Sequence, residues 1–350
     1  MRVEGWLRDL WQDIIDQPRA IRAHTTELGR ASRLVQEVGA KAAVPPVFTG
    51  MATSLYAWRA AEWAIQRRGL PGPWVVDTAE LLDYGPPVNR DPRPLFVISR
   101  SGESAEVTRL VQALDGRRLV VAITETPDSL LARRAQYVLA FRADERAFQN
   151  TKSFILSLAY ALACAQGLGA DLGDPPSVWA EEAAVAVERL VQTGVDTDAV
   201  SATLASCTAV LVVGRGRMSG VVQQVALDLQ ESLHMAAIPV TGGLFRHGPV
   251  ELTTRRDVGT LLFIPDDEAA PLGLGILEEL RGRSAPVAAL VAETIPVEPG
   301  VPVVRVPRVR SALHPMVFAV AMQLLNLQLL QLRGADCATP RLVEKVTRRE

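Results

Sequence analysis

A serine-rich turn within "FVISRSGESAEVTRLVQAL" (96–114) carries residues suited to bind an anion. An apolar run precedes the turn and apolar residues at helical spacing follow it, so the turn joins a strand to a helix. The first amides of a helix are unpaired and partly positive, and hydroxyls add hydrogen bonds, so a phosphate can bind there without a basic patch. The candidate phosphate-binding and sugar-binding residues of this turn are Ser99, Arg100, Ser101, Gly102 and Ser104.

The alternative for this turn is that Ser99 or Ser101 only caps the helix. Serine is a preferred N-cap residue, and Glu103 and Glu106 would favour the first helical turn by their negative charge. The residues of the turn alone leave both interpretations open.

The elements that position this turn occur twice along the chain. The stretch "PPVFTGMATSLYAWRAAEWAIQ", from Pro45, and the stretch "AVLVVGRGRMSGVVQQVALDLQ", from Ala209, share the order apolar run, glycine turn, small polar residue, helix. Short runs of Val, Ile and Leu alternate with helix-length segments in both copies, as in parallel strands buried on both faces. We therefore predict an α/β fold of two tandem domains, each a doubly wound, mostly parallel sheet flanked by helices.

The predicted boundaries follow the repeat. They are an N-terminal helical arm (1–30), a first domain with the phosphate loop (31–173), a helical linker (174–198), a second domain (199–335) and a C-terminal tail (336–350). In the second copy the matching loop reads "FIPDDEAAPLG", and Asp266, Asp267 and Glu268 would repel a phosphate. The sequence thus predicts one phosphate site per chain, in the first domain.

Composition excludes several classes of protein. The 37 Lys and Arg nearly balance the 39 Asp and Glu, so a net charge of −2 gives no reason to expect nucleic acid or an anionic membrane as partner. The N-terminal stretch lacks the apolar core of a signal peptide, which favours a cytoplasmic protein. Three separate cysteines without C-x-x-C, and a single E-x-x-H, argue against a disulfide framework or a metal site.

The motifs together indicate a family. "VISRSGES" resembles the serine-rich phosphate loop of sugar isomerase (SIS) domains, and "TGMATSLYAWRAAE" looks like their first strand, loop and helix. The two-copy layout, "VVGRGRMSGVVQQVALDLQESLHMAAIPVTGGLFRHGPVEL" and the tail "GADCATPRLVEKVT" are similar to the isomerase half of glutamine-fructose-6-phosphate amidotransferase and to its stand-alone deaminase and deglycase relatives. The resemblance covers nearly all of residues 30 to 350 and implies two tandem SIS domains.

The resemblance also implies roles for three residues. The base that moves a proton between C1 and C2 falls on Glu231, the histidine of ring opening on His247, and the lysine that forms an imine with the open-chain ketose on Lys345. Each has an ordinary alternative: a solvated helix carboxylate, a surface imidazole in a loop, and a solvated tail lysine. For Lys345 to act, the tail must fold back onto the site.

Further sugar and phosphate contacts carry over to Ser99, Ser101 and Ser104, and to the first-strand hydroxyl Ser54 with Thr53 beside it.

Four positions depart from the family pattern. The amidotransferase has a lysine and a glutamate where this chain has Asp228 and Gln224, a second glycine at Ala52, and a serine at Asn150. A changed charge beside the base favours a different substrate. Residue 2 is not the cysteine that the glutaminase domain requires, so the resemblance implies no glutaminase activity.

The sequence therefore predicts an isomerase/deaminase of an amino-sugar 6-phosphate resembling glucosamine 6-phosphate, which releases ammonia and a ketose 6-phosphate. A fructosamine-6-phosphate deglycase and a non-catalytic sugar-phosphate-binding regulator are the alternatives. The resemblance implies a homodimer in which the histidine loop of one subunit completes its neighbour's site. It implies no cofactor, because the imine comes from a protein lysine, and no metal.

Overall fold

The structure, a computed structural model, describes residues 2–42, 44–66, 69, 71–334, 342 and 344–348. The chain forms two compact units. The first-sheet unit comprises Arg19–Glu145, Lys152–Glu181 and Val343–Glu350, and the second-sheet unit comprises Met1–Pro18, Arg146–Thr151 and Glu182–Leu342. Of the predicted tail, residues 336–341, 343, 349 and 350, Cys337 among them, lie outside the described residues.

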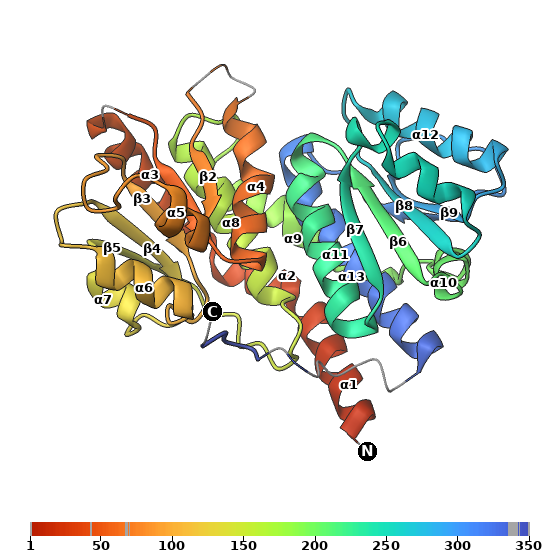
Figure 1. The fold of residues 1–350 in the computed structure, drawn as a ribbon, viewed down its shortest axis with the longest axis horizontal. Helices are drawn as coiled ribbons and strands as arrows, with labels where there is room; N and C mark the ends of the chain where they lie inside the picture. The colour runs from red at the N-terminus through yellow and green to blue at the C-terminus, as the bar shows by residue number, and fades with distance from the viewer. Residues whose placement is uncertain are drawn as a thin grey trace. The chain divides into compact units, whose positions relative to one another are not determined.

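The first-sheet unit is built on five parallel strands in the order β2-β1-β3-β4-β5 (Figure 1). Its strands are β1 Val47–Gly50, β2 Trp74–Asp77, β3 Leu95–Ile98, β4 Val120–Thr124 and β5 Tyr137–Ala140. Its helices are α3 Thr25–Lys41, α4 Thr53–Gln66, α5 Thr78–Tyr84, α6 Ala105–Ala113, α7 Leu130–Arg134 and α8 Lys152–Gly167. The division between the units falls within α2 (Gln17–Ala23) and α9 (Pro176–Thr193).

Alternate residues of these strands bury against different helices. Val47, Leu95 and Val97 pack in one apolar core with residues of α5, α6 and α7. The neighbouring Phe48 turns to the opposite face, where its ring stacks on Trp58 of α4 at 4.0 Å. Successive side chains of a strand point to opposite faces, so a sheet covered on both sides needs apolar residues throughout. This explains why the strands read as continuous apolar runs.

The second sheet repeats this design. Its order, β7-β6-β8-β9-β10, matches β2-β1-β3-β4-β5 strand for strand, and all its pairs are parallel. The predicted α/β fold with two doubly wound parallel sheets is thereby confirmed. The strands are β6 Ala209–Gly214, β7 Ala236–Thr241, β8 Val258–Ile264, β9 Val287–Ala292 and β10 Val303–Val306. The helices are α1 Arg2–Ile15, α10 Asp198–Ala205, α11 Ser219–Leu233, α12 Ala270–Gly282 and α13 His314–Arg333, with short 3-10 turns η1 Gly216–Met218, η2 Leu244–Arg246, η3 Pro249–Thr254 and η4 Ser311–Leu313.

The longest apolar helix belongs to the interior of the second-sheet unit. The segment Ser311–Arg333 is long and apolar enough to cross a membrane by length and composition, but 94% of its apolar window is buried within the fold. A core helix that packs against several others has this composition without any lipid contact.

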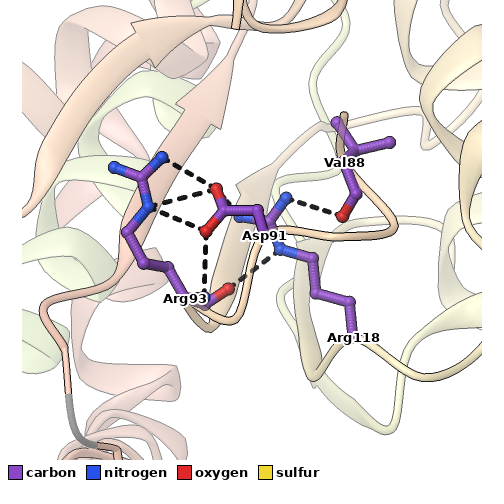
Figure 2. Close-up of polar contacts among 4 residues, drawn as sticks. All are labelled: Val88, Asp91, Arg93 and Arg118. Atoms are coloured by element: carbon purple, nitrogen blue, oxygen red, sulfur yellow. Dashed lines mark hydrogen bonds and ion pairs between the residues drawn. The ribbon is translucent and has the colours of Figure 1, made fainter. Parts of the chain in front are cut away.

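A buried ion cluster fixes the start of two strands of the first sheet (Figure 2). Asp91 lies between two guanidinium groups: Arg93 Nη2 is 2.8 Å and Arg118 Nη2 is 3.1 Å from Oδ2. Arg118 also donates from Nη1 to the carbonyl of Val88 and from Nε to the carbonyl of Arg93. The side chains of Asp91 and Arg118 are only 3% and 1% exposed. Because Arg93 precedes β3 and Arg118 precedes β4, the cluster ties the loop 85–94 to both strands.

The charge of Asp91 is set by its partners. Burial raises the pKa of this carboxyl group, but the hydrogen bonds from Arg93 and the charges of Arg118 and Arg93 outweigh burial and hold the pKa below its ordinary value. A carboxyl group whose pKa is lowered by folding stabilises the folded state above its unfolded pKa of about 4 and loses that contribution as the pH falls.

We expect Asp91→Asn to lower the free energy of unfolding by about 3 kcal/mol at pH 7, because it leaves buried Arg118 without its carboxylate. Urea unfolding followed by circular dichroism measures this. Asp83→Asn is the matched control: Asp83 pairs with Arg109 at 2.6 Å but is 44% exposed, so its loss costs less than about 1 kcal/mol. The effect of Asp91→Asn should begin to shrink as the pH falls below about 5, one unit above the unfolded pKa, and should continue to shrink at lower pH. Equal effects of both variants at pH 7 contradict the role of burial.

Candidate phosphate site

Two turns meet at one edge of the first sheet because their strands are neighbours. β1 pairs with β3 in parallel, with Val47 opposite Leu95 and Thr49 opposite Val97. The turn after β1 and the turn after β3 therefore leave the sheet at the same carboxyl edge. β2 lies on the other side of β1, so the order in which strands are added to the sheet reverses between β1 and β3. Such a switch point is where open α/β sheets bind ligands.

The serines of the second turn accept hydrogen bonds from the turn's own amides. Gly102 N–H donates to Ser99 Oγ at 3.1 Å, Glu103 N–H to Ser101 Oγ at 3.2 Å, and Val107 N–H to Ser104 Oγ at 3.4 Å. Ser104 is the N-cap of α6, the role that the capping alternative gave to Ser99 or Ser101. Since each oxygen accepts an amide proton, each hydroxyl proton can be donated to a ligand.

The turn also leaves amide donors for an anion. Among the described residues, the backbone N–H groups of Arg100, Ser101 and Ser104 have no hydrogen-bond acceptor. The carbonyl of Arg100 is held by the loop after β4, with donors Thr124 Oγ1 at 3.1 Å and Glu125 N at 3.1 Å. Unpaired amides at a fixed helix start are the usual way in which proteins bind a phosphate.

Sequence reasoning missed the support that the β4 loop gives to the turn. Thr124 and Thr126 both donate a hydroxyl to the carbonyl of Arg100, and one carboxylate oxygen of Glu125 accepts the amides of Ala143 and Asp144. The signal was present in the sequence, because these polar residues follow directly on the apolar run that forms β4.

Glycine is required at position 102 for two reasons. Its φ of +65° lies in the left-handed region, and a Cβ atom there would lie 2.1 Å from Ser129 Oγ. Ser129 is itself the N-cap of α7, so it has little freedom to move away. The turn after β3 is thus packed directly against the start of α7.

The turn after β1 carries the other predicted contacts and a strained residue. Ala52 has a φ of +45°, although the resembled family uses glycine here. An alanine in this region costs about 1 kcal/mol relative to glycine. Thr53 starts α4 and is buried, and Ser54 follows with its amide bonded to the carbonyl of Met51 at 3.0 Å. Strained backbone of this kind gathers at functional sites.

The C-terminal segment contacts the phosphate turn. The N–H of Ala105, the first of α6, donates to the carbonyl of Thr347 at 3.0 Å. Arg100 Nη2 donates to the carbonyl of Lys345 at 3.4 Å. The side chain of Lys345 is exposed. Within the first-sheet unit, two hydrogen bonds to backbone carbonyls therefore join the segment that carries Lys345 to the phosphate turn and to the start of α6.

Glu231 and His247 belong to the second-sheet unit. Glu231 lies in the last turn of α11, is half-buried, and has no hydrogen-bond or ion-pair partner among the described residues. Burial raises the pKa of this carboxyl group above its ordinary value. His247 is exposed directly after η2. An unpaired carboxyl group with a raised pKa is typical of a general acid or base.

The two charge departures of α11 are joined to each other. Gln224 Nε2 donates to Asp228 Oδ1 at 2.8 Å, and both side chains are buried. One turn further on, Ser232 Oγ bonds to Asn326 of α13, which in turn donates to Gln149. Ser232 Oγ also donates to the backbone carbonyl of Asp228. A polar network therefore connects α11, the helix of Glu231, with α13 and Gln149. Asn150, the fourth departure, follows Gln149 directly in the chain.

At the carboxyl edge of the second sheet, the side chain of Asp267 occupies the position of an anion. At the turn after β8, Asp267 Oδ1 accepts the amide of Ala269 at 2.9 Å, and Oδ2 lies 3.7 Å from Arg217 Nε. The first sheet has unpaired amides at the corresponding edge. Over the described part of the chain, no group of three or more His, Cys, Asp or Glu side chains is arranged to hold a metal.

Residues 72–165, which include the phosphate turn, match the family model described as SIS domain. The chain is related to SIS-domain proteins. It is 26% identical over 351 residues to the glutamine–fructose-6-phosphate aminotransferase (isomerizing) of Methanothermobacter thermautotrophicus, an alignment that covers 97% of this chain and 57% of the relative. The chain thus spans about half the length of the curated relatives it matches.

Two solved structures share the fold over nearly their whole length. The C-terminal domain of glucosamine-fructose-6-phosphate aminotransferase from Francisella tularensis superposes with a TM-score of 0.79 at 20% identity and covers 95% of this chain and 98% of that one. A glucosamine-6-phosphate deaminase from Thermotoga maritima gives 0.73 at 19% identity and covers 97% and 100%. The α/β architecture of this chain is thus the one found in these proteins.

We expect Gly102→Ala to weaken the binding of inorganic phosphate by at least about tenfold. The new methyl group would push the turn away from Ser129, and a displacement of about 1 Å is enough to misplace the groups that bind a ligand. Isothermal titration calorimetry measures the affinity. Gly116→Ala is the control: its φ is +87°, but the nearest atom is 3.8 Å away, on Arg134. This control should lose about 1 kcal/mol of stability and keep its phosphate affinity. Unchanged affinity in Gly102→Ala contradicts the placement of the phosphate.

Proposed function

We propose that the protein is an isomerase/deaminase of an amino-sugar 6-phosphate and releases ammonia and a ketose 6-phosphate. The observation that carries the proposal is the turn at Ser99–Ser104, with unpaired amides and with the segment of Lys345 hydrogen-bonded against it. The glucosamine-6-phosphate deaminase from Thermotoga maritima, whose fold this chain shares, supports the choice of an amine-bearing substrate.

The proposed reaction uses three side chains. His247 assists ring opening to the aldehyde, and Glu231 moves a proton from C2 to C1, which converts the amine at C2 into an imine. The amine of Lys345 adds to C2 and ammonia leaves, so that a lysine imine replaces the substrate imine. Water then hydrolyses the lysine imine to the ketone and frees Lys345. The overall change is addition of one water and loss of one ammonia, and no cofactor is needed.

We also propose that the working form is a homodimer in which His247 acts in the neighbouring subunit's site. The exposed apolar side chains beside this histidine support an interface there, with Leu244 62% and Leu252 38% exposed. Apolar surface of this kind around a loop is typical of a protein contact.

Incubation of the protein with glucosamine 6-phosphate and its isomers should release ammonia, which a coupled dehydrogenase assay detects. Glu231→Gln and Lys345→Ala should each lower the rate at least about 100-fold, because each removes a group that moves a proton or forms a bond. Glu278→Gln, an exposed carboxylate of α12, is the control and should leave the rate unchanged. Release of an amino acid from a fructosamine 6-phosphate, without ammonia from any amino sugar, would replace this proposal by a deglycase.

The pH profile should report Glu231. A base must be ionised, and burial raises its pKa above the ordinary value of 4.5, so kcat/KM should fall with decreasing pH along a limb centred above pH 4.5. Circular dichroism at each pH confirms that the fold persists. A rate that stays constant down to pH 4.5 in folded protein contradicts the assignment of Glu231 as the base.

A further inference from the structure

A buried carboxyl group, Glu106, lies in the helix that follows the phosphate turn. Glu106 lies in the first turn of α6 and is only 7% exposed. Its Oε2 is buried and has no hydrogen-bond partner within the described part of the chain. A buried carboxylate oxygen without a donor is unfavourable, so a donor from outside the chain is expected.

The position of Glu106 limits what this donor can be. Glu106 follows Ala105, whose amide is already bonded to Thr347, and it lies in the first turn of the helix that begins directly after the phosphate turn. A phosphate at the unpaired amides of Arg100 and Ser101 and a carboxylate at Glu106 are like charges, which repel each other. A ligand that carries only negative charge is therefore opposed by Glu106, and a ligand that also carries a protonated amine is attracted by it.

We propose that Glu106 accepts a hydrogen bond from the protonated amine of the phosphosugar, and that it selects amine-bearing sugar phosphates over those with a hydroxyl group at the same carbon. This inference rests on the proposed function, since it assumes that the phosphate binds at Ser99–Ser104. Glu103, in the same turn, is exposed and hydrated, so it contributes much less to this choice.

Two unreactive ligands test this selection. 2-Amino-2-deoxyglucitol 6-phosphate and glucitol 6-phosphate differ only in an amine against a hydroxyl, and neither has a carbonyl group that the enzyme could convert. Calorimetry at pH 7 should show that the unaltered protein binds the amine at least about tenfold more tightly, as for a hydrogen bond to a charged group. Glu106→Gln should remove the preference, mainly by weaker binding of the amine, and Glu103→Gln should keep it.

The outcomes separate this inference from the proposed function. If the unaltered protein binds both alditol phosphates equally, the role of Glu106 is wrong and the phosphate site stands. The same conclusion follows if Glu106→Gln and Glu103→Gln change both affinities alike. If the unaltered protein binds neither alditol phosphate nor inorganic phosphate, the site itself fails and the proposed function falls with it. The first comparison needs no variant, so it decides the matter even if Glu106→Gln does not fold.

Discussion

The parallel pairing of β1 with β3 is the constraint on which the phosphate site depends. A parallel pair sends the chain out of the sheet at one edge, so the turns at 51–54 and 99–104 must lie together. Gly50 permits this approach, because a Cβ atom there would lie 2.7 Å from the carbonyl of Ile98. The buried cluster of Asp91 and Arg118 holds the opposite ends of the neighbouring strands. Strand pairing thus determines the position of the two turns, and the serines determine which hydrogen-bond donors the turns present.

The repeat, the strands and the phosphate turn could be predicted from the sequence because their signals are local. The apolar run at 96–98, the serines after it and the helical spacing from Val107 onward each depend on residues close in the chain, and the structure has β3 and α6 there. The burial of Glu106 and the bond between Ala105 and Thr347 depend on residues far apart in the chain. Neither composition nor periodicity reports such contacts.

The left-handed backbone at Ala52 shows a different limit of sequence reasoning. Alanine is rare at a φ of +45°, so its identity alone favours an ordinary conformation. The resembled family has glycine at this position, so the alanine was recognised as a departure. The resemblance did not show that the backbone keeps the left-handed conformation when the residue is alanine. The pairing of β1 with β3 and the start of α4 at Thr53 determine the backbone here, and they outweigh the preference of one residue.

The two sheets differ in how they treat negative charge, and the proposed binding of a dianion at one place on a nearly neutral chain depends on this difference. The second sheet places Asp267 against the amide of Ala269 and near Arg217, so a carboxylate of the chain already takes up these donors. Within the described residues, the first sheet keeps three amides unpaired at its own carboxyl edge. A dianion is attracted there by fixed dipoles instead of by net charge. Because dipoles act over a short range, a single carboxylate such as Glu106 can decide which anions are accepted.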